Sequence, residues 1–370
     1  MTSDVAIIGA GIAGASLAWH LAADRSVLLL EGEEFPGYHT TGRSAALFSE
    51  TYGNEVIRSL TSGSRGFYEA PPAGFAAAPL LGPRGCLHIA RAEQAAELEA
   101  KMREIPKIRP ISSEDARRRV PALYPDSVAL AGWDETEMDI DVHALHQGYL
   151  RGAKAQGARL VSGARIEAIE RHDGAWQLSA GAQRFTARIL VIAAGAWADA
   201  IGALAGAAPI GLEPKRRTAV LIDPPAQYDV AGWPMVSAGD GNFYFKPDAG
   251  RLMLSPADEA PSPPCDAQPE ELDVALCIDR VQRAADLPVR RVVRAWAGLR
   301  SFVADHSPVV GFDSQVEDLF WLAGQGGYGI QTAPGMGLLA ASLCRGQGVP
   351  PALTAHGVTE ASLSPARLST

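Results

Sequence analysis

Cysteine is scarce in this chain of 370 residues, which contains only Cys86, Cys265, Cys277 and Cys344. No two of them form a Cys-x-x-Cys pair, so neither a disulfide scaffold nor a zinc site is indicated. We therefore expect no bound metal. Scattered thiols without pairing are typical of the cytosol. The sequence predicts a cytoplasmic protein, and a location peripheral to the inner membrane stays open.

An excess of positive charge and long apolar runs are also lacking. The 33 basic and 42 acidic residues give a net charge of −9, which repels phosphate groups and argues against a nucleic-acid partner. The apolar N-terminus is interrupted by three glycines and has no basic segment before it, unlike a signal peptide or membrane helix. No integral membrane segment is therefore expected, although peripheral membrane contact stays open. A hydrophobic content of 47% over this length suggests two domains.

The first 31 residues carry the most informative motif. Residues 5–8 are a short apolar run suited to a buried strand, and a Gly-x-Gly-x-x-Gly motif follows at Gly9, Gly11 and Gly14. These glycines permit a tight turn, close approach of a pyrophosphate, and close packing of helix on strand. A second apolar run, residues 27–30, ends at Glu31, whose carboxylate can bind a ribose diol. The pattern predicts FAD or NAD, rather than NADP, with its phosphates at the helix N-terminus.

Two later segments have similar chemistry. Gly42, Arg43 and Ser44 lie in a loop of small residues, and a helix is predicted to begin near Ser44. Spacing alone leaves open whether Arg43 and Ser44 bind a cofactor or belong to an ordinary capped helix. Near the C-terminus, a glycine-rich turn at residues 324–329 precedes a helix predicted from about residue 333 to 343. Glycine-rich helix starts at both ends of the chain suggest one extended cofactor, which favours FAD.

Periodicity predicts the remaining elements in outline. Helices are expected at 55–69, 92–102, 112–119, 141–156 and 270–285, strands near 85–90, 187–194 and 319–323, and a β-rich region over 212–299.

These motifs together resemble the D-amino acid oxidase-like group of FAD-dependent oxidoreductases. Within it, the chain is most similar to bacterial FAD-dependent D-arginine dehydrogenase, on stretches that include 36–46, 145–151, 214–217, 246–250, 296–305 and 325–332. The resemblance implies an α/β fold in which a Rossmann-like FAD-binding domain is interleaved with a mixed-sheet substrate domain. The FAD-binding domain would comprise residues 1–85, 142–213 and 301–370, and the substrate-binding domain residues 86–141 and 214–300. Non-covalent FAD is also implied.

The resemblance assigns the cofactor contacts to four groups of residues. They are Gly9, Gly11, Ile12, Ala13, Gly14 and Glu31; Gly42, Arg43, Ser44 and Ala45; Ile166, Ala194, Gly195 and Trp197; and Gly326, Gly327, Tyr328, Gly329, Ile330, Gln331 and Thr332.

It also assigns the catalytic roles. Arg217 and Arg300 match arginines that hold the substrate carboxylate, a task that suits a guanidinium because its donors pair with both oxygens. Tyr244 matches a second contact to the carboxylate, and Tyr52 matches a loop tyrosine over the pocket. Gly327 matches a residue whose carbonyl holds the amine, and Gln331 matches a polar residue near the flavin. Without the family, the sequence leaves open whether Arg217, Tyr52 and Tyr244 lie in a site or at ordinary surface or core positions. Arg300 follows an apolar segment where an unpaired charge would be costly.

Two departures from that family bear on the substrate. Leu47 stands where D-arginine dehydrogenase has an active-site histidine, and Cys86 where it has the glutamate that binds the substrate guanidinium. A cationic side chain would lose its charge partner. We expect a pocket for neutral, hydrophobic side chains, completed by Ser49, Met235 and Ser237.

The expected reaction is oxidative deamination of a D-amino acid by a D-amino acid dehydrogenase. A hydride passes from Cα to flavin N5, and the imino acid hydrolyses to a 2-oxo acid and ammonia. One alternative is an FAD-dependent amine oxidase that uses O₂ on glycine, sarcosine or another secondary amine acid. Another is a flavoprotein that binds FAD without turnover. The electron acceptor, a quinone or O₂, stays open.

Overall fold

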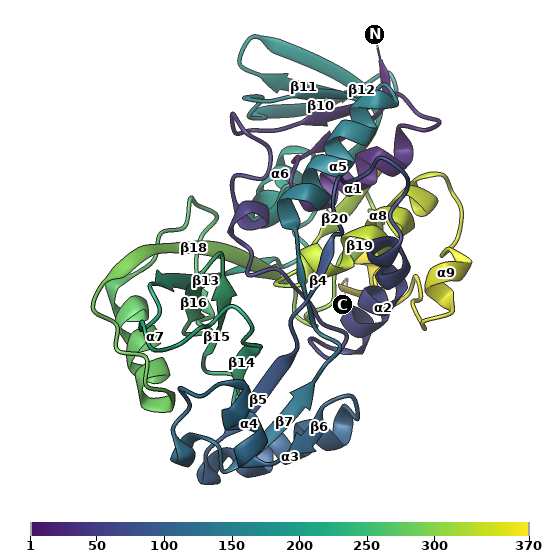
Figure 1. Ribbon diagram of the computed structural model, residues 1–370. Helices are drawn as coiled ribbons and strands as arrows, with labels where there is room; N and C mark the ends of the chain where they lie inside the picture. The colour runs from purple at the N-terminus through teal and green to yellow at the C-terminus, as the bar shows by residue number, and fades with distance from the viewer. Residues whose placement is uncertain (1, 369–370) are drawn as a thin grey trace.

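A computed structural model gives the structure of the chain and describes residues 2–368. Two large β-sheets with helices packed on them and one small sheet form this part of the molecule (Figure 1). In Figure 1 the sheet that contains the N-terminal strand lies in the upper half, and the second large sheet lies below it, near the α7 and α4 labels. No helix of residues 2–368 is long and apolar enough to cross a membrane.

The first sheet has a parallel centre formed by the continuous apolar runs. Its order is β10-β11-β12-β1-β2-β9, and β20 pairs with both β12 and β19. Its strands are β1 (Ser3–Ile8), β2 (Val27–Leu30), β9 (Arg159–Val161), β10 (Ala168–His172), β11 (Ala175–Ala180), β12 (Gln183–Ile192), β19 (Val309–Phe312) and β20 (Leu319–Ala323). The β9, β2, β1, β12 and β20 strands run parallel, as expected where helices cover both faces of a sheet.

Helices from distant parts of the chain cover this sheet. On one face pack α1 (Ile12–Leu21), α2 (Glu55–Glu69), α5 (Val142–Ala155) and α8 (Gly329–Cys344). Their apolar side chains share one core with those of β1 and β2, in which Ile7, Leu17 and Leu339 are fully buried. On the other face, Ile8 and Trp321 pack with Ala198 of α6 (Ala198–Leu204). A short α9 (Pro351–Thr354) contacts α2.

The second large sheet has the order β17-β13-β16-β15-β14-β5-β7-β6, with β18 paired along β13. Its strands are β5 (Cys86–Ala90), β6 (Arg109–Ile111), β7 (Leu130–Asp134), β13 (Glu213–Ile222), β14 (Met235–Ala238), β15 (Tyr244–Asp248), β16 (Arg251–Ser255), β17 (Ala260–Pro261) and β18 (Val292–Phe302). Three helices pack on it: α3 (Ala95–Glu104), α4 (Ser113–Arg119) and α7 (Glu271–Ala284).

The two faces of the second sheet differ in character. One face carries Leu87, Val236 and Phe245, which form a core with α4 and α7. Cross-strand pairing places His88, Ser237 and Tyr244 in one row on the opposite face, because paired residues point to the same side. A small antiparallel sheet of β3 (Leu47–Phe48), β8 (Met138–Ile140) and β4 (Leu81–Pro83) lies beside this second face, where Lys246 of β15 pairs with Asp139 of β8.

The fold confirms the expected mixed α/β architecture. Strands of the first sheet come from residues 3–30, 159–192 and 309–323, and strands of the second from residues 86–134 and 213–302. This interleaving follows the order of the predicted segments, while the domain boundaries themselves stay a prediction. Helices expected at 55–69, 112–119, 141–156 and 270–285 correspond to α2, α4, α5 and α7.

The helix predicted to begin near Ser44 is wrong. A single 3-10 turn, η1 (Thr40–Arg43), ends there, Ser44 is extended, and Ala46 has a φ of 54°. The chain must turn sharply at this point because Leu47 and Phe48 pair with β8, and such a bend is incompatible with a continuing helix.

The C-terminal helix begins at Gly329, earlier than expected, and includes Pro334. Proline has no N–H to donate to the carbonyl four residues before it. The Tyr68 hydroxyl donates to the Ile330 carbonyl at 2.5 Å instead. Tertiary contact with α2 therefore replaces the missing helical hydrogen bond.

Candidate active site

An elongated cavity of about 510 Å³ is lined by elements of both large sheets. Its wall includes the β1–α1 turn, the end of β12, parts of β13 and β18, and the turn before α8. Of the predicted cofactor residues, the cavity is lined by Gly9, Gly11, Ile12, Ala13, Glu31, Arg43, Ser44, Ala45, Ile166, Ala194, Gly195, Trp197, Gly326, Gly327, Gly329 and Ile330. The predicted residues outside the lining are Gly14, Gly42, Tyr328, Gln331 and Thr332.

Each of the three glycines of the first turn is required for a different structural reason. Gly9 has a φ of +103°, and a Cβ there would lie 2.3 Å from the Ala193 carbonyl oxygen. A Cβ on Gly14 would lie 1.9 Å from the Gly9 carbonyl oxygen, so helix α1 could not pack this closely on β1. Gly11 borders the cavity directly. Gly9 and Gly11 therefore present bare backbone to the cavity, whereas Gly14 serves the packing of α1 on β1.

The start of α1 is less free than the motif indicates. The Ile12 N–H donates to Thr41 Oγ1 at 3.0 Å, and the Ala10 N–H donates to Glu31 Oε2 at 2.9 Å. The Ile12 N–H is thus engaged within the protein, and the placement of phosphates at this helix start stays a prediction. Thr41 was missed because it lies 29 residues from Ile12, and no local spacing reveals such a cap.

Arg43 lines the cavity, but its guanidinium forms hydrogen bonds within the protein. One guanidinium nitrogen donates to the carbonyls of Ala267 and Ala297, each at 2.9 Å, and the other contacts Asp266 at 2.5 Å. These bonds fasten η1 to β18 and to the loop between β17 (Ala260–Pro261) and α7. Of the two alternatives left open by the sequence, this geometry favours the structural one for Arg43.

The lining fits FAD along its length. At one end Glu31 presents a carboxylate that is already oriented by the N–H groups of Ala10 and Glu33. At the other end Gly298 and Gly327 line the wall without side chains. Gly326 has a φ of +54°, and a Cβ on it would lie 2.2 Å from Phe302. This lining matches the parts of FAD in turn. The Glu31 carboxylate can accept from a ribose, bare glycine backbone can approach a pyrophosphate, and the end with few side chains can hold a flat ring.

The end of the cavity near Gly327 is cationic. Arg300 lies against Gly327, whose Cβ would be 2.9 Å from the guanidinium, and donates to the Tyr52 hydroxyl at 3.2 Å. No carboxylate oxygen of residues 2–368 lies within 4.0 Å of the Arg300 guanidinium. Burial acts to lower the pKa of Arg300, but Tyr52 and Tyr244 outweigh it and raise the pKa. Arg300 is therefore a charged group without a carboxylate partner that faces the cavity.

Arg217 and Tyr244 lie at the same end. Arg217 donates to the Asp258 carbonyl at 2.7 Å and to Glu259 Oε1 at 2.9 Å, so part of its guanidinium is already engaged. Tyr244 is 8% exposed and lines the cavity with Ala219. The structure thus brings together three of the residues predicted to hold a carboxylate, while their roles stay predictions.

Tyr52 lies at the edge of this end rather than in the lining. Its side chain is 41% exposed and packs against the Tyr328 ring, with 4.9 Å between the centroids. Partial burial acts to raise the pKa of the Tyr52 hydroxyl, but the positive charges of Arg300 and Arg217 outweigh it and hold the pKa below its usual value. Tyr52 is placed to cover the cationic end.

The predicted side-chain pocket lies behind the cavity wall. Its five residues, Leu47, Ser49, Cys86, Met235 and Ser237, are absent from the lining. An apolar cluster of Ala45, Ala219, Leu221, Met235, Tyr244, Met253 and Trp296 stands at this boundary. Gln331 is also buried outside the lining, where its amide donates to Ser49 O at 3.2 Å and Thr61 Oγ1 at 2.8 Å. Gln331 thus joins α8 to α2 and to the loop after β3.

Cys86 has an acidic neighbour that the sequence did not reveal. Donor atoms of Cys86, His88 and Glu137 all lie within 4.8 Å of one another, and all three residues are buried. Lys101 Nζ lies 3.4 Å from His88 Nδ1, so its ammonium opposes a dication and leaves the imidazole proton on Nε2. We assign no metal to these residues, and the expectation of no metal stays a prediction.

Comparisons with known proteins agree with this geometry. A family model described as FAD dependent oxidoreductase matches residues 4–343. FAD-dependent oxidoreductase domain-containing protein 1 of Mus musculus is 25% identical over 403 residues, which cover 92% of this chain and 81% of that protein. Glycine oxidase from Geobacillus kaustophilus superposes with a TM-score of 0.81 at 22% identity, covering 94% of this chain and 95% of that structure. L-proline dehydrogenase from P. horikoshii superposes with a TM-score of 0.81 at 22% identity, covering 100% and 98%.

The family match covers most of the chain and includes every segment that lines the cavity. FAD is therefore the cofactor that the cavity accommodates, and the fold is the one shared with glycine oxidase and L-proline dehydrogenase. The resemblance to D-arginine dehydrogenase in particular stays a prediction. The chain belongs to the FAD dependent oxidoreductase family.

Proposed function

We propose that the protein oxidises the amine group of a D-amino acid with a neutral side chain. The observation that carries this proposal is Arg300, a charged guanidinium that faces the cavity beside Gly327 without a carboxylate partner. A partly buried cation of this kind is costly unless a ligand supplies the opposite charge. The α-carboxylate of an amino acid supplies it with two oxygens in the geometry that a guanidinium pairs best.

The neighbours of Arg300 support the same ligand. Arg217 has one guanidinium nitrogen without a hydrogen-bond partner in residues 2–368, and the Tyr244 side chain lines the same end. Arg217 and Arg300 thus offer donors to a carboxylate from β13 and β18, which pair side by side, and Tyr244 offers its hydroxyl from β15. The Gly327 carbonyl is proposed to accept a hydrogen bond from the substrate amine.

The surroundings of this end support a neutral side chain. The acidic residues in the lining are Glu31 and Glu33, which belong to the opposite end. The boundary near Tyr244 is apolar and includes Met235 and Trp296. A cationic side chain there would be desolvated without a partner.

In the proposed mechanism the protein positions the substrate and restricts its movement. FAD, when bound, supplies the acceptor for the hydride of Cα. Arg300 and Arg217 hold the carboxylate, which orients Cα within the cavity. His39 is the histidine in the lining, and it is paired with Glu33 at 3.0 Å. Since no lining Asp, Glu or His stands free beside Arg300, the amine loses its proton to water, and the imino acid product hydrolyses to a 2-oxo acid and ammonia.

Anaerobic stopped-flow reduction of the purified flavoprotein tests this proposal. The panel comprises D-Met, D-Leu, D-Phe, D-Arg and D-Lys with their L-enantiomers. We expect the neutral D-amino acids to bleach the flavin fastest. D-Arg as the best substrate would overturn the side-chain preference, a preference for the L-enantiomers would overturn the stereochemistry, and no bleaching by any of them would overturn the activity.

A second candidate is oxidation of glycine or sarcosine. The observation in its favour is that the cavity stops short of Leu47, Cys86 and Met235, which leaves little room for a long side chain. The likeness to glycine oxidase supports it at the level of fold. Peroxide formation in air with glycine or sarcosine, at a higher kcat/KM than with D-Met, would favour this candidate. Reduction of a quinone without peroxide formation would favour a dehydrogenase.

A further inference from the structure

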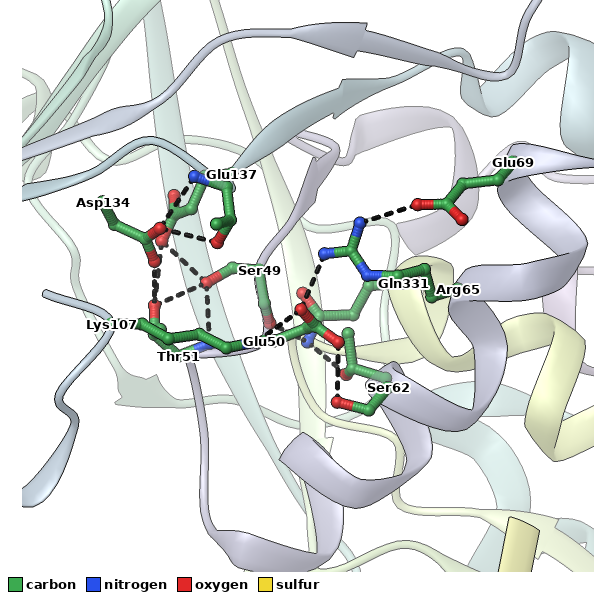
Figure 2. A network of polar contacts seen from close by, with 12 residues as sticks. Ser49, Glu50, Thr51, Ser62, Arg65, Glu69, Lys107, Asp134, Glu137 and Gln331 are labelled. Atoms are coloured by element: carbon green, nitrogen blue, oxygen red, sulfur yellow. Dashed lines mark hydrogen bonds and ion pairs between the residues drawn. The ribbon is translucent and has the colours of Figure 1, made fainter. Parts of the chain in front are cut away.

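A buried polar cluster joins Ser49 and Thr51 to Asp134 and Glu137 (Figure 2). Glu137, from the turn between β7 and β8, is 3% exposed, and Asp134 at the end of β7 is fully buried. Ser49 Oγ lies 2.7 Å from Glu137 Oε1, and Thr51 Oγ1 lies 3.0 Å from Asp134 Oδ2 and 3.2 Å from Glu137 Oε1. Two carboxylates thus hold the residues on either side of Glu50 and immediately before Tyr52.

The two hydroxyl groups of this cluster supply two hydrogens fewer than its close oxygen contacts require. Ser49 Oγ and Thr51 Oγ1 also lie 3.1 Å apart, so four close oxygen pairs share two hydroxyl protons. If Ser49 donates to Glu137 and Thr51 donates to Asp134, the contact between Thr51 and Glu137 has no proton while both carboxylates are ionised. A proton on Glu137 supplies that hydrogen bond and removes the repulsion between two buried negative charges.

The loop connects this cluster to the cationic end of the cavity. Tyr52 follows Thr51 directly, and its hydroxyl accepts a hydrogen bond from Arg300 at 3.2 Å. On the other side, the Gln331 amide donates to the Ser49 carbonyl at 3.2 Å, which fastens the loop to α8. Asn54 then begins α2 as its N-cap. The position of Tyr52 is therefore set by residues that are buried on the far side of the loop.

The groups around Glu137 favour its protonated form. Burial raises the pKa of Glu137 to about 7, and the charge of Asp134 adds to this, although Ser49, Lys101 and Thr51 act in the opposite direction. The other titratable groups nearby are Cys86, whose pKa burial raises well above its usual value, and His88, whose pKa burial and Lys101 lower well below it. Cys86 and His88 are therefore neutral near pH 7, and Glu137 is the member of the cluster that titrates there.

The direction of the pH effect follows from linkage. In this arrangement Glu137 binds its proton more tightly than it would in water, where its pKa is about 4.5. The arrangement is therefore fully favoured below about pH 4.5 and loses that advantage as the pH rises through about 7. Above pH 7 the loop is expected to open more often, because an opened loop lets water reach the ionised carboxylate.

We propose that Glu137 is a positioning residue for Tyr52, and that its protonation holds the loop of residues 49–53 closed over the cationic end of the cavity. The closed loop keeps Tyr52 on Arg300 and narrows the access of water. That Tyr52 covers a substrate carboxylate rests on the proposed function. The closing of the loop by Glu137 does not, because every contact that carries it lies within the protein.

Hydrogen exchange of the ligand-free holoprotein tests the proposal without any substrate. Exchange of a peptide that covers residues 47–56 is measured at about pH 6 and about pH 8.5 and corrected for the intrinsic chemical rate. We expect protection of this loop to fall on the order of tenfold between the two pH values, because linkage between a Glu137 pKa of about 7 in the closed loop and about 4.5 in the opened loop increases opening by about that factor over this range. Equal protection at both pH values would overturn the proposal.

Two variants identify the group that is responsible. Glu137→Gln supplies an amide hydrogen and no charge, so its loop should keep the protection that the wild type has at low pH, at both pH values. Glu135→Gln makes the same chemical change at an exposed position of the same turn and should behave as the wild type does. A pH dependence that persists in Glu137→Gln, or that disappears in Glu135→Gln, would contradict the role of Glu137.

A kinetic measurement links the loop to turnover. The substrate is the amino acid that reduces the flavin fastest. Between about pH 6 and about pH 8.5, its KM should rise more steeply in the wild type than in Glu137→Gln. The ratio of the wild-type kcat to the Glu137→Gln kcat should stay constant over the same range. Identical KM profiles, combined with a pH-dependent loop, would show that the loop moves but does not position Tyr52 for the substrate. That outcome would overturn the positioning role. If no amino acid reduces the flavin, the proposed function fails and the exchange result still decides the role of Glu137.

Discussion

At the scale of single residues, the decisive feature is the difference between Arg300 and the other arginines near it. Arg216, on β13, is enclosed by Asp273 and Glu270, and Arg43 donates to Asp266 and to backbone carbonyls. Arg300 has only a tyrosine hydroxyl as a hydrogen-bond partner within the described residues. The absence of a protein carboxylate is what supports the proposal that Arg300 binds a ligand carboxylate.

Replacement of Arg300 by lysine should reduce kcat/KM by about 100-fold. Lysine keeps the charge but offers a single point donor in place of the paired donors of guanidinium, and loss of hydrogen bonds to a charged group costs about 3 kcal/mol. Steady-state kinetics with the best amino acid checks this. The control is Arg294→Lys on the same strand, at an exposed position beside Trp296, which should stay within about twofold. An equal loss in both variants would show that β18 is merely disturbed.

A second residue with a shifted pKa lies in the same loop as Tyr52. Glu50 contacts Arg65 at 2.6 Å, Lys107 at 2.7 Å and Ser62 at 2.7 Å (Figure 2). Burial alone would raise the pKa of Glu50, but these three partners outweigh it and lower the pKa to about 2. A carboxyl with a depressed pKa stabilises the fold above its usual pKa of about 4.5, and this contribution is lost as the pH falls through about 2.

Glu50→Gln should therefore lower the free energy of unfolding by about 1–2 kcal/mol near pH 7, and by less than half of that near pH 3. Urea unfolding at the two pH values measures the difference. Glu69 offers a matched control, because it also pairs with Arg65 but is 54% exposed. Glu69→Gln should change the free energy by no more than about 0.5 kcal/mol. A similar loss in both variants would contradict the importance of burial at Glu50.

At the scale of elements, the βαβ unit depends on how closely α1 packs on β1. The pair is held by glycine contacts at the start of the helix and by apolar residues along it, such as Leu17 and Ile7. Thr41 adds a cap from another segment by accepting the Ile12 N–H. The helix start is thus a product of packing and a distant side chain, and not only of the glycine motif.

Two glycine-to-alanine changes in helices should have opposite effects. In Gly14→Ala the new Cβ would lie 1.9 Å from the Gly9 carbonyl oxygen, so the backbone must shift, at a cost of about 3 kcal/mol or more. In Gly66→Ala, within α2, nothing lies within 4 Å of the new Cβ, and alanine should stabilise the helix by about 0.5–1 kcal/mol. Chemical unfolding of the two variants compares them directly. Tolerance of Gly14→Ala at wild-type stability would refute the packing argument.

At the scale of the whole molecule, the cavity joins two sheets whose strands alternate along the chain. Glu31 at one end belongs to the first sheet region, while Arg217 and Arg300 at the other end lie on β13 and β18 of the second. A cofactor that extends along this cavity touches both. Binding of FAD should therefore stabilise the folded molecule as a whole.

Addition of FAD to the apoprotein at about one hundred times its Kd should raise Tm by about 2–4 °C, since saturation at that level contributes about 2.7 kcal/mol. FMN serves as the matched ligand, because it carries the same ring without the adenosine half. With nothing to occupy the Glu31 end, FMN at the same concentration should raise Tm by less than half as much. Thermal unfolding followed by circular dichroism checks both, and an equal rise with FMN would show that the Glu31 end does not hold adenosine.

The sequence by itself determined the opening βαβ unit, the glycine turns, the FAD class of cofactor and most helices. These features rest on local rules: apolar runs, glycines at fixed spacing and an acid about twenty residues on. Such rules act within a few turns of chain, which is why residues 3–31 were predictable in detail.

Only the tertiary structure decided what surrounds the cationic end of the cavity. It placed Cys86 beside Glu137 and behind the cavity wall, engaged Arg43 with β18, and turned the chain at Ser44 toward β8. These outcomes depend on hydrogen bonds and pairings between segments that are tens to hundreds of residues apart. The free energy of a buried charge is set by such partners. Arg300 was therefore identifiable as a candidate from sequence, but its lack of a carboxylate partner became visible only in the folded chain.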